Sequence, residues 1–399
     1  WHDGRRVTAD DVKFTFEVLR DPKHPVPAAG QIEGIAAITL EASDRFIITF
    51  DAPPADPARQ LTFPILPAHL FRSGPPTRTH PFRLHPIGSG PYLLERFDTD
   101  GTLRLTRHLG YPPGRPEIPR IELREIRDKQ IQMEALRFGN LEVVVRVMPR
   151  DLPDLERVRR IELHPYQTNS WWYLGFNLTA PPWSDLAMRQ ALSALIDVDR
   201  LLEPIGGGER ITGPFVPSSP YYNHRAEIPL SRPDPVRARR LLEQAGYARD
   251  AQGRIVRQGK PLRLVLAVEK ALPVAKEVAV NLEGQLKRAG IDVELKWLDP
   301  VGWTEEVVER RAFDLSLSQW SFDRGEVVFD QFHSQGRHNY IGYHNPQIDR
   351  WLQRARTEVE PAARRQANQE VHRLVAIDLP YLFLWTLTQY AAFSTEVRN

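Results

Sequence analysis

The sequence predicts an α/β protein built around a parallel sheet. Three strand-like runs alternate with two helical runs between residues 262 and 319, and connections of that kind join parallel neighbours in one sheet. Of the 399 residues, 41% are apolar and 26% charged, which is typical of a globular chain of two or three domains. The 35 prolines predict many rigid turns between short elements.

Local patterns assign the elements of the N-terminal half in order. Thr8, with Asp11 three residues later, is typical of a helix start, and the apolar residues that follow share one helical face. Two hairpins, a Pro-rich stretch containing a domain boundary, a helix that stops at Gly139 and a buried-type strand come next. The hairpins are expected at 35–50, with a turn at 42–45, and at 88–106, with a turn at 98–101. The Pro-rich stretch is 51–87, the helix 129–138 and the strand 141–147.

The C-terminal half begins with a strand candidate at 171–177. Ser184 is expected to cap the next helix, and Asp234, followed by proline, caps another that ends at Gly246. In the alternating unit, strands are expected at 262–268, 291–297 and 313–319, and helices at about 272–289 and about 301–311. Two amphipathic helices at about 345–378 and a last strand at 381–387 follow.

Composition excludes several classes of protein. With 53 basic and 51 acidic residues, the formal net charge of +2 argues against a nucleic-acid-binding face. No apolar run approaches the ~20 residues of a membrane span. Cysteine is absent, which excludes disulfides, Cys-ligated metals and thiol nucleophiles. The chain opens on Trp1 with neither Met nor an apolar leader, so we expect it to be an excerpt of a longer protein, without its signal segment.

Enzyme motifs are missing as well. The stretch 206–208 is Gly-rich but lacks the Lys-Ser/Thr pair of a phosphate loop, and neither Gly-x-Ser-x-Gly nor His-Glu-x-x-His occurs. The densest histidine group, His333, His338 and His344, matches no metal-ligand spacing, and Glu305-Glu306 is predicted to lie on a solvated helix face. We therefore expect a binding protein, with no cofactor and no metal, rather than an enzyme.

Charged and aromatic side chains follow two strands of the alternating unit. Ligands of open α/β sheets bind outside the carboxyl ends of the strands. Glu269-Lys270 follows the first strand and Trp320-Ser321-Phe322-Asp323 the third, so an acid, a base and an indole are expected near one rim. Such a set suits a zwitterion, since the acid can bind an ammonium and the lysine a carboxylate. The alternative is a strand-end ion pair beside a core tryptophan.

Aromatic residues gather near the predicted strands: Trp171, Trp172, Tyr173, Trp297, Trp303 and Trp320. Most of them are expected to pack in the core. Because neighbouring side chains of a strand point to opposite faces, one of Trp171 and Trp172 is expected to face away from the core.

Short motifs run along the whole chain. They are Trp1-His2-Asp3-Gly4 with Val7-Thr8-Ala9-Asp10-Asp11-Val12, Gly88-Ser89-Gly90-Pro91-Tyr92, and the stretches 135–144, 174–177, 182–192, 196–197, 238–247, 290–293, 332–334, 339–349 and 378–381. In this order the set resembles solute-binding protein family 5, the extracytoplasmic receptors of peptide ABC importers. Each motif alone is short, but the ordered set is specific.

The resemblance implies a periplasmic-binding-protein-like fold, with two lobes around a ligand cleft and the first lobe split into two subdomains. The expected parts are 1–85 for the small subdomain, 86–183 completed by 387–399 for the ligand-facing part of lobe one, and 184–386 for lobe two. Hinges near 177–184 and 384–390 would close around the ligand. Since the family extends beyond both ends of this chain, some first-lobe strands are expected to be missing.

The resemblance also implies a ligand site. Peptide binders of the family place an Asp three residues after a Trp, where it pairs with the terminal ammonium of the ligand, and Trp320 and Asp323 match that spacing. The Asp-Pro that usually follows is replaced here by residues 325–328. The Arg with which some dipeptide binders hold the ligand carboxylate would align at or beside Glu269, with Lys270 as the nearest substitute. The predicted ligand-binding residues are Asp323, Trp320, Gln319, Ser321, Lys270, Trp172, Tyr173 and Asn177.

The implied function is a bacterial extracytoplasmic receptor, periplasmic or at the cell surface, that captures peptides and delivers them to the transmembrane subunits of an ABC permease. It is expected to be a monomer, with a lipid anchor on a preceding segment as an option. Two alternatives stay open. The same fold could carry an oligosaccharide, a metal chelate or another small solute, and a sugar would be bound by a Trp face rather than by Asp323. It could also be the ligand-sensing domain of a regulator.

Overall fold

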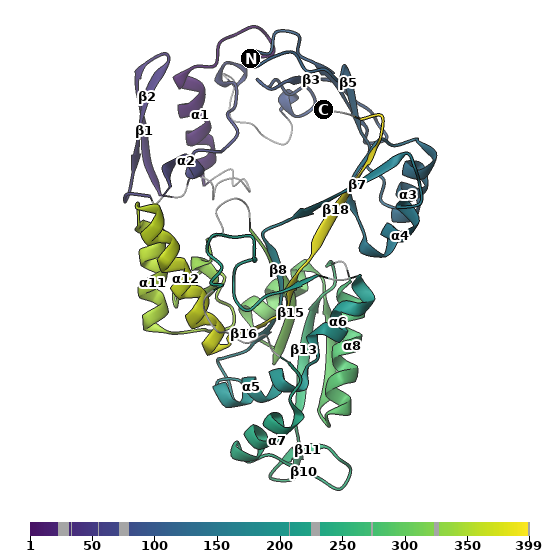
Figure 1. Cartoon of the computed structure of the whole chain (residues 1–399). Coiled ribbons are helices and arrows are strands. Elements are labelled where there is room, and N and C mark those ends of the chain that lie inside the picture. Colours follow the sequence, from purple (N-terminus) through teal and green to yellow (C-terminus); the bar gives the residue numbers. More distant parts are fainter. Residues whose placement is uncertain are drawn as a thin grey trace. The chain divides into compact units, whose positions relative to one another are not determined.

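The computed structural model describes residues 1–22, 32, 34–54, 56–71, 80–206, 208–224, 232–272, 274–322 and 327–397. They form two compact units, Trp1–Glu134 and Ala135–Asn399. Helices alternate with strands in the second unit, so the α/β class is confirmed (Figure 1). The subdomain boundaries expected after residues 85, 183 and 386 stay predictions.

In the first unit, a helix packs on a two-stranded hairpin. Phe16 of α1 (Ala9–Arg20) lies in one apolar cluster with residues of β1 (Ile35–Ala42) and β2 (Arg45–Phe50). Their antiparallel pairing confirms the first predicted hairpin. The second hairpin is also confirmed, and a third strand extends it into the sheet β3-β4-β5. The other elements of this unit are α2 Pro57–Gln60, β3 Tyr92–Phe97, β4 Leu103–Arg107 and β5 Arg120–Leu123. The helix α3 (Lys129–Phe138) begins in this unit and ends in the second.

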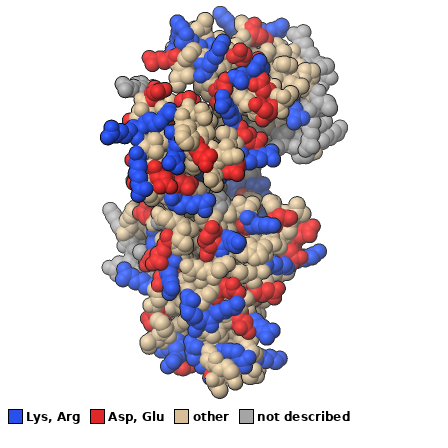
Figure 2. All heavy atoms as spheres, turned by 90° about the vertical axis from the view of Figure 1, so that its right-hand side faces the viewer, with Lys and Arg blue, Asp and Glu red and all other residues tan. Residues whose placement is uncertain are grey.

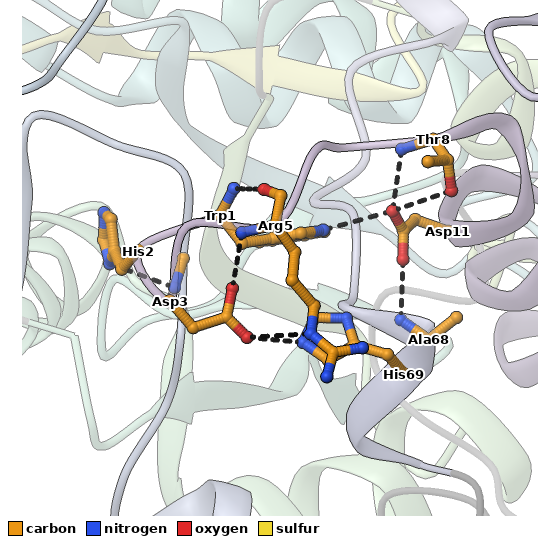
Figure 3. Close-up of polar contacts among 9 residues, drawn as sticks. Trp1, His2, Asp3, Arg5, Thr8, Asp11, Ala68 and His69 are labelled. Atoms are coloured by element: carbon orange, nitrogen blue, oxygen red, sulfur yellow. Dashed lines mark hydrogen bonds and ion pairs between the residues drawn. The ribbon is translucent and has the colours of Figure 1, made fainter.

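A buried carboxylate ties the first residues of the chain to α1 (Figure 3). Asp11, which is 3% exposed, accepts hydrogen bonds from the backbone N–H of Thr8 at 2.8 Å and of Ala68 at 2.8 Å, and from Nε1 of Trp1 at 3.1 Å. The helix start predicted from Thr8 and Asp11 is confirmed. The same carboxylate holds two further segments, which local sequence does not reveal.

His2 links the opening motif to the motif at residues 88–92. Its backbone N–H donates to the carbonyl of Gly88 at 2.9 Å, and its Nδ1 accepts from the Gly88 N–H at 3.2 Å. Its Nε2 lies 2.9 Å from the carbonyl oxygen of Gly90. Two of the motifs that carry the family resemblance therefore build one local structure.

Replacing Asp11 by alanine is expected to lower the free energy of unfolding by about 2 kcal/mol, because four donors, including the Thr8 hydroxyl, lose a buried acceptor. Denaturant titration measures this loss. Asp11→Asn, which keeps one acceptor oxygen, should lose less, and Asp10→Ala on the exposed side of the same turn should be neutral. Equal stability of Asp11→Ala and Asp10→Ala would contradict the assigned role.

The second unit is built on a five-stranded sheet of order β14-β13-β15-β8-β16. β13 (Arg263–Glu269) is parallel to β14 (Asp292–Leu298) and to β15 (Leu315–Ser321), which confirms the alternating unit. β8 (Ser170–Phe176) runs antiparallel between β15 and β16 (Tyr381–Phe383).

Two elements of the alternating unit differ from the prediction. The third strand reaches Ser321, because its last residues pair with the start of β8. The second helix is only α9 (Pro300–Trp303), continued by a π-helical turn over Thr304–Glu309. In that turn Glu306 is not simply solvated, since it pairs with Lys296 and Arg310.

Both faces of this sheet are covered by helices (Figure 1). One layer consists of α5 Leu186–Leu195, α6 Val198–Leu202, α7 Pro235–Gln244 and α8 Ala275–Arg288, and the other of α10 Phe329–Phe332, α11 Pro346–Thr357 and α12 Pro361–Asp378. Trp172 lies in the first core at 2% exposure and Trp171 in the second at 1%. The prediction that one of these indoles faces away from the core was wrong, because both faces of the sheet are core.

Other predicted ends were corrected by contacts distant in sequence. Asp185, not Ser184, caps α5 by accepting from the Ala187 N–H at 2.9 Å, whereas Asp234 caps α7 as expected. The last strand is divided into β16 and β17 (Trp385–Thr386), and β17 pairs with β9 (Glu209–Arg210).

A small sheet of order β6-β18-β7 completes the larger elements of this unit. β6 (Val143–Val147) was expected to be a buried strand but lies at an edge, where Val145 is 70% exposed. β18 (Thr388–Ser394) pairs with β6 and with β7 (Ile161–Gln167). The short elements are α4 Leu152–Leu155, β10 Ala248–Arg249, β11 Ile255–Arg257 and β12 Lys260–Pro261.

His372 of α12 is a buried imidazole with no exposed surface. Its Nε2 lies 3.0 Å from Oγ1 of Thr212, and the rings of Phe215 and Tyr222 pack around it. Burial, with a smaller contribution from His224, lowers the pKa of His372 from 6.5 to about 3. The ring is therefore neutral at pH 7.

This pKa difference predicts acid sensitivity. Below pH 6.5 the unfolded chain binds a proton on His372, and the folded chain does so only near pH 3, so stability is lost as the pH falls through that window. Between about pH 7.5 and about pH 5 this group should lower the free energy of unfolding by about 2 kcal/mol. His372→Gln should lack this share of the pH dependence in denaturant titrations. Identical pH slopes in the two proteins would contradict the prediction.

Candidate functional site

The carboxyl ends of β13 and β15 carry most of the predicted ligand-binding residues. Trp320 is partly buried and stacks on Tyr173, with ring centroids 6.0 Å apart and planes 9° from parallel. Ser321 is exposed, and its Oγ lies 2.9 Å from Oγ of Ser170. Lys270, the residue after β13, is exposed and donates its backbone N–H to the carbonyl of Leu298. An indole, a hydroxyl and an ammonium thus occupy one edge of the sheet.

The predicted acid of this site, Asp323, lies outside the described residues. The last described residue before it, Phe322, is partly buried and stacks on Trp171 at 5.9 Å between ring centroids. Its backbone N–H donates to the carbonyl of Asn169 at 2.9 Å. The chain is therefore attached to the edge of the sheet up to the residue that precedes Asp323.

Gln319 and Trp172 lie at the same strand ends but on the other face of the sheet, and Asn177 lies at the opposite edge. Gln319 pairs with Trp172 across β15 and β8, and Trp172 belongs to the core on the face opposite Trp320. Asn177 lies at the amino end of β15, where its Nδ2 donates to the carbonyls of Arg311 and Phe313. Since β8 is antiparallel to β15, its residues 170–173 reach the carboxyl edge and its last residues the opposite edge.

A hydrogen-bonded network lies beneath Trp320. Ser318 Oγ donates to Oε2 of Glu269 at 2.5 Å, and Ser318 lies opposite Tyr173 in the pairing of β15 with β8. The hydroxyls of Tyr173 and Tyr340 are 2.7 Å apart, and the Tyr340 hydroxyl lies 3.1 Å from Oγ of Ser316. Burial raises the pKa of Tyr173 and of Tyr340 well above the ordinary value, so both hydroxyls keep their protons.

The sequence-based site set omitted Ser318 and left Glu269 as a position of uncertain use. The spacing of strand residues could have indicated Ser318, because it lies two residues before Trp320 and therefore on the same face. The contacts of Ser318 with Tyr173 and Glu269 could not be found in this way, since they depend on the pairing of β15 with β8 and with β13, which lie about 145 and about 50 residues away in the chain.

The three histidines of the densest group do not converge. His333 stacks on Phe329, and His338 lies beside Trp320 with ring centroids 5.7 Å apart. His344 is exposed. In the part of the chain that the structure describes, no three His, Asp or Glu side chains are placed to hold a metal ion.

The surface carries charges of both signs. Figure 2 shows Lys and Arg interspersed with Asp and Glu over the face that it presents, in keeping with the formal net charge of +2. None of the described helices is both long and apolar enough to cross a membrane.

Comparison with known proteins agrees with the fold. Residues 1–338 match the family described as bacterial extracellular solute-binding proteins, family 5 Middle. The oligopeptide-binding protein AppA of Bacillus subtilis is 24% identical over 420 residues, which cover 100% of this chain and 76% of AppA. The di/tripeptide-binding protein 4 of Pseudomonas aeruginosa is 25% identical over 411 residues, covering 95% of this chain and 73% of that protein.

Solved structures share the fold at low sequence identity. AppA of Bacillus subtilis in complex with a nonapeptide has a TM-score of 0.79 at 22% identity and covers 99% of this chain and 80% of its own. NikZ of Campylobacter jejuni in complex with Ni(L-His) has a TM-score of 0.82 at 22% identity and covers 100% of this chain and 81% of its own. The periplasmic-binding-protein-like fold is thereby confirmed, and with residues 1–338 matched, the chain belongs to the bacterial extracellular solute-binding proteins of family 5.

Proposed function

We propose that this chain is the receptor of an ABC importer that captures peptides outside the cytoplasmic membrane and delivers them to the permease subunits. The observation that carries the proposal is Trp320, half-buried at the carboxyl end of β15, followed three residues later by Asp323. Membership of an extracellular solute-binding family supports the location, and relatives named for oligopeptides and di/tripeptides support the cargo.

In this proposal Asp323 binds the terminal ammonium of the peptide. The indole of Trp320 covers apolar parts of the ligand, and Tyr173, stacked beneath it, holds its orientation. The ammonium of Lys270 and the hydroxyl of Ser321 are available to carboxylate and carbonyl oxygens of the peptide. Gln319, Trp172 and Asn177 support the strands that carry these groups. The receptor acts as a monomer and releases its ligand at the permease.

Native mass spectrometry of the chain tests this function. The chain would be mixed with an equimolar set of unmodified peptides of two to nine residues, and separately with the same peptides acetylated at the amino terminus. We expect one-to-one adducts with the unmodified set and weaker adducts with the acetylated set. An oligosaccharide and a nickel–histidine complex are offered in parallel. Adducts with one of these and with no peptide would mean that the chain binds that solute instead of peptides. No adduct with any peptide would overturn the proposal.

A further inference from the structure

Glu269 ends β13 with a carboxylate that the network beneath Trp320 holds in place. In the register of β13 with β15, Val268 faces Leu317, so Glu269 lies beside Ser318. The Ser318 hydroxyl donates to Oε2 of Glu269 at 2.5 Å, and Ser318 lies opposite the buried Tyr173 in the pairing of β15 with β8. A carboxylate fixed by such a hydrogen bond loses little rotamer freedom when it binds a partner.

The charge of Glu269 has no counterpart among the described residues. Its neighbour Lys270 is exposed and forms no ion pair with it there, and the contact that Glu269 makes is with an uncharged hydroxyl. The strand-end ion pair that stands as the alternative at this rim would join Lys270 to Asp323, which lies outside the described residues. A partly buried carboxylate without a cation among the described residues around it gains most from a cation supplied by a ligand.

The surroundings of Glu269 suit an organic cation. Trp320 and Ser318 lie two residues apart on β15 and thus on the same face of the sheet as Glu269. Carboxylates and indole faces both attract ammonium and guanidinium groups, the first by charge and the second by the quadrupole of the ring. In the sequence, Asp323 comes only two residues after the end of β15.

We propose that Glu269 is a second cation-binding position of the solute site, which selects peptides carrying a basic side chain. This inference rests on the proposed function and deepens it. Asp323 binds the ammonium that peptides with a free amino terminus have in common, whereas Glu269 binds the ammonium of a lysine or the guanidinium of an arginine within the peptide. Ser318 acts as a positioning residue, because its hydroxyl orients the carboxylate.

The test compares Glu269→Gln with the unchanged chain. Each is offered an equimolar pentapeptide library in which every inner position carries lysine, arginine, norleucine or citrulline, and bound peptides are quantified by mass spectrometry. The unchanged chain should enrich lysine over norleucine and arginine over citrulline at one position, by about tenfold. Glu269→Gln should lose this enrichment, because its affinity for the basic peptides should fall by a much larger factor than its affinity for the neutral ones. Ser318→Ala should reduce the enrichment without abolishing it.

Glu294→Gln removes the same charge from an exposed site on β14 and serves as the matched control. If it lowers the enrichment as much as Glu269→Gln does, the effect is one of net charge and the proposal fails. The proposal also fails if Glu269→Gln weakens neutral and basic peptides equally, while the peptide-binding function stands. If the unchanged chain binds no peptide, the function and the inference fall together. Thermal unfolding of each variant confirms that it is folded.

Discussion

Asp323→Ala is expected to weaken the binding of a peptide with a free amino terminus by about 2–5 kcal/mol, because a desolvated ammonium loses its counter-charge. This is a 30-fold or greater rise in the dissociation constant, at about 1.4 kcal/mol for each factor of ten. Titration calorimetry with one defined neutral peptide from the native mass spectrometry set measures it directly.

A double-mutant cycle separates this contact from a general loss of structure. The same peptide, acetylated at its amino terminus, has no ammonium to pair with Asp323. It should bind the unchanged chain weakly, and it should bind Asp323→Ala with the same low affinity. If the substitution lowers the affinity for both peptides equally, Asp323 does not bind the terminal ammonium. Asp323→Asn, with the same shape and no charge, should behave as Asp323→Ala does.

Arg189→Met is expected to lower the free energy of unfolding by about 3 kcal/mol or more, because Arg189 is 6% exposed and satisfies four carbonyl groups. Its guanidinium donates to the carbonyls of Leu379 at 2.9 Å, Asp378 at 2.7 Å, Trp183 at 2.8 Å and Ser184 at 3.1 Å. These groups belong to the entry of α5 and to the end of α12. Removing the side chain leaves them buried without a donor.

The controls for Arg189 use charge and shape. Arg240→Met removes an exposed arginine from α7 and should leave stability unchanged within about 0.5 kcal/mol. Arg189→Lys keeps the charge but cannot reach four carbonyls, since an ammonium has three donors on one atom. It should therefore recover only part of the loss in denaturant titration. Full recovery by lysine would mean that charge alone, near Asp378 and Asp185, explains the role of Arg189.

Local patterns were sufficient for most elements. The alternating unit, the caps at Thr8 and Asp234 and the first two hairpins follow from short-range rules, because a period of apolar residues and a capping side chain act within a few residues. Errors occur where a distant segment decides. β15 extends to Ser321 because β8 offers partners there, and β6 is an edge strand because it has β18 on one side only.

The candidate site shows the same division. The sequence by itself determined the family, through motifs in a specific order, and the edge of the sheet at which Trp320 and Lys270 lie. Only the tertiary structure decided which side chains meet at that edge. The antiparallel insertion of β8 moves Asn177 to the far end, puts Trp172 on the other face and brings Tyr173 next to Ser318. Strand direction and register are set by pairing between segments far apart in the chain, and hence by contacts that no local pattern encodes.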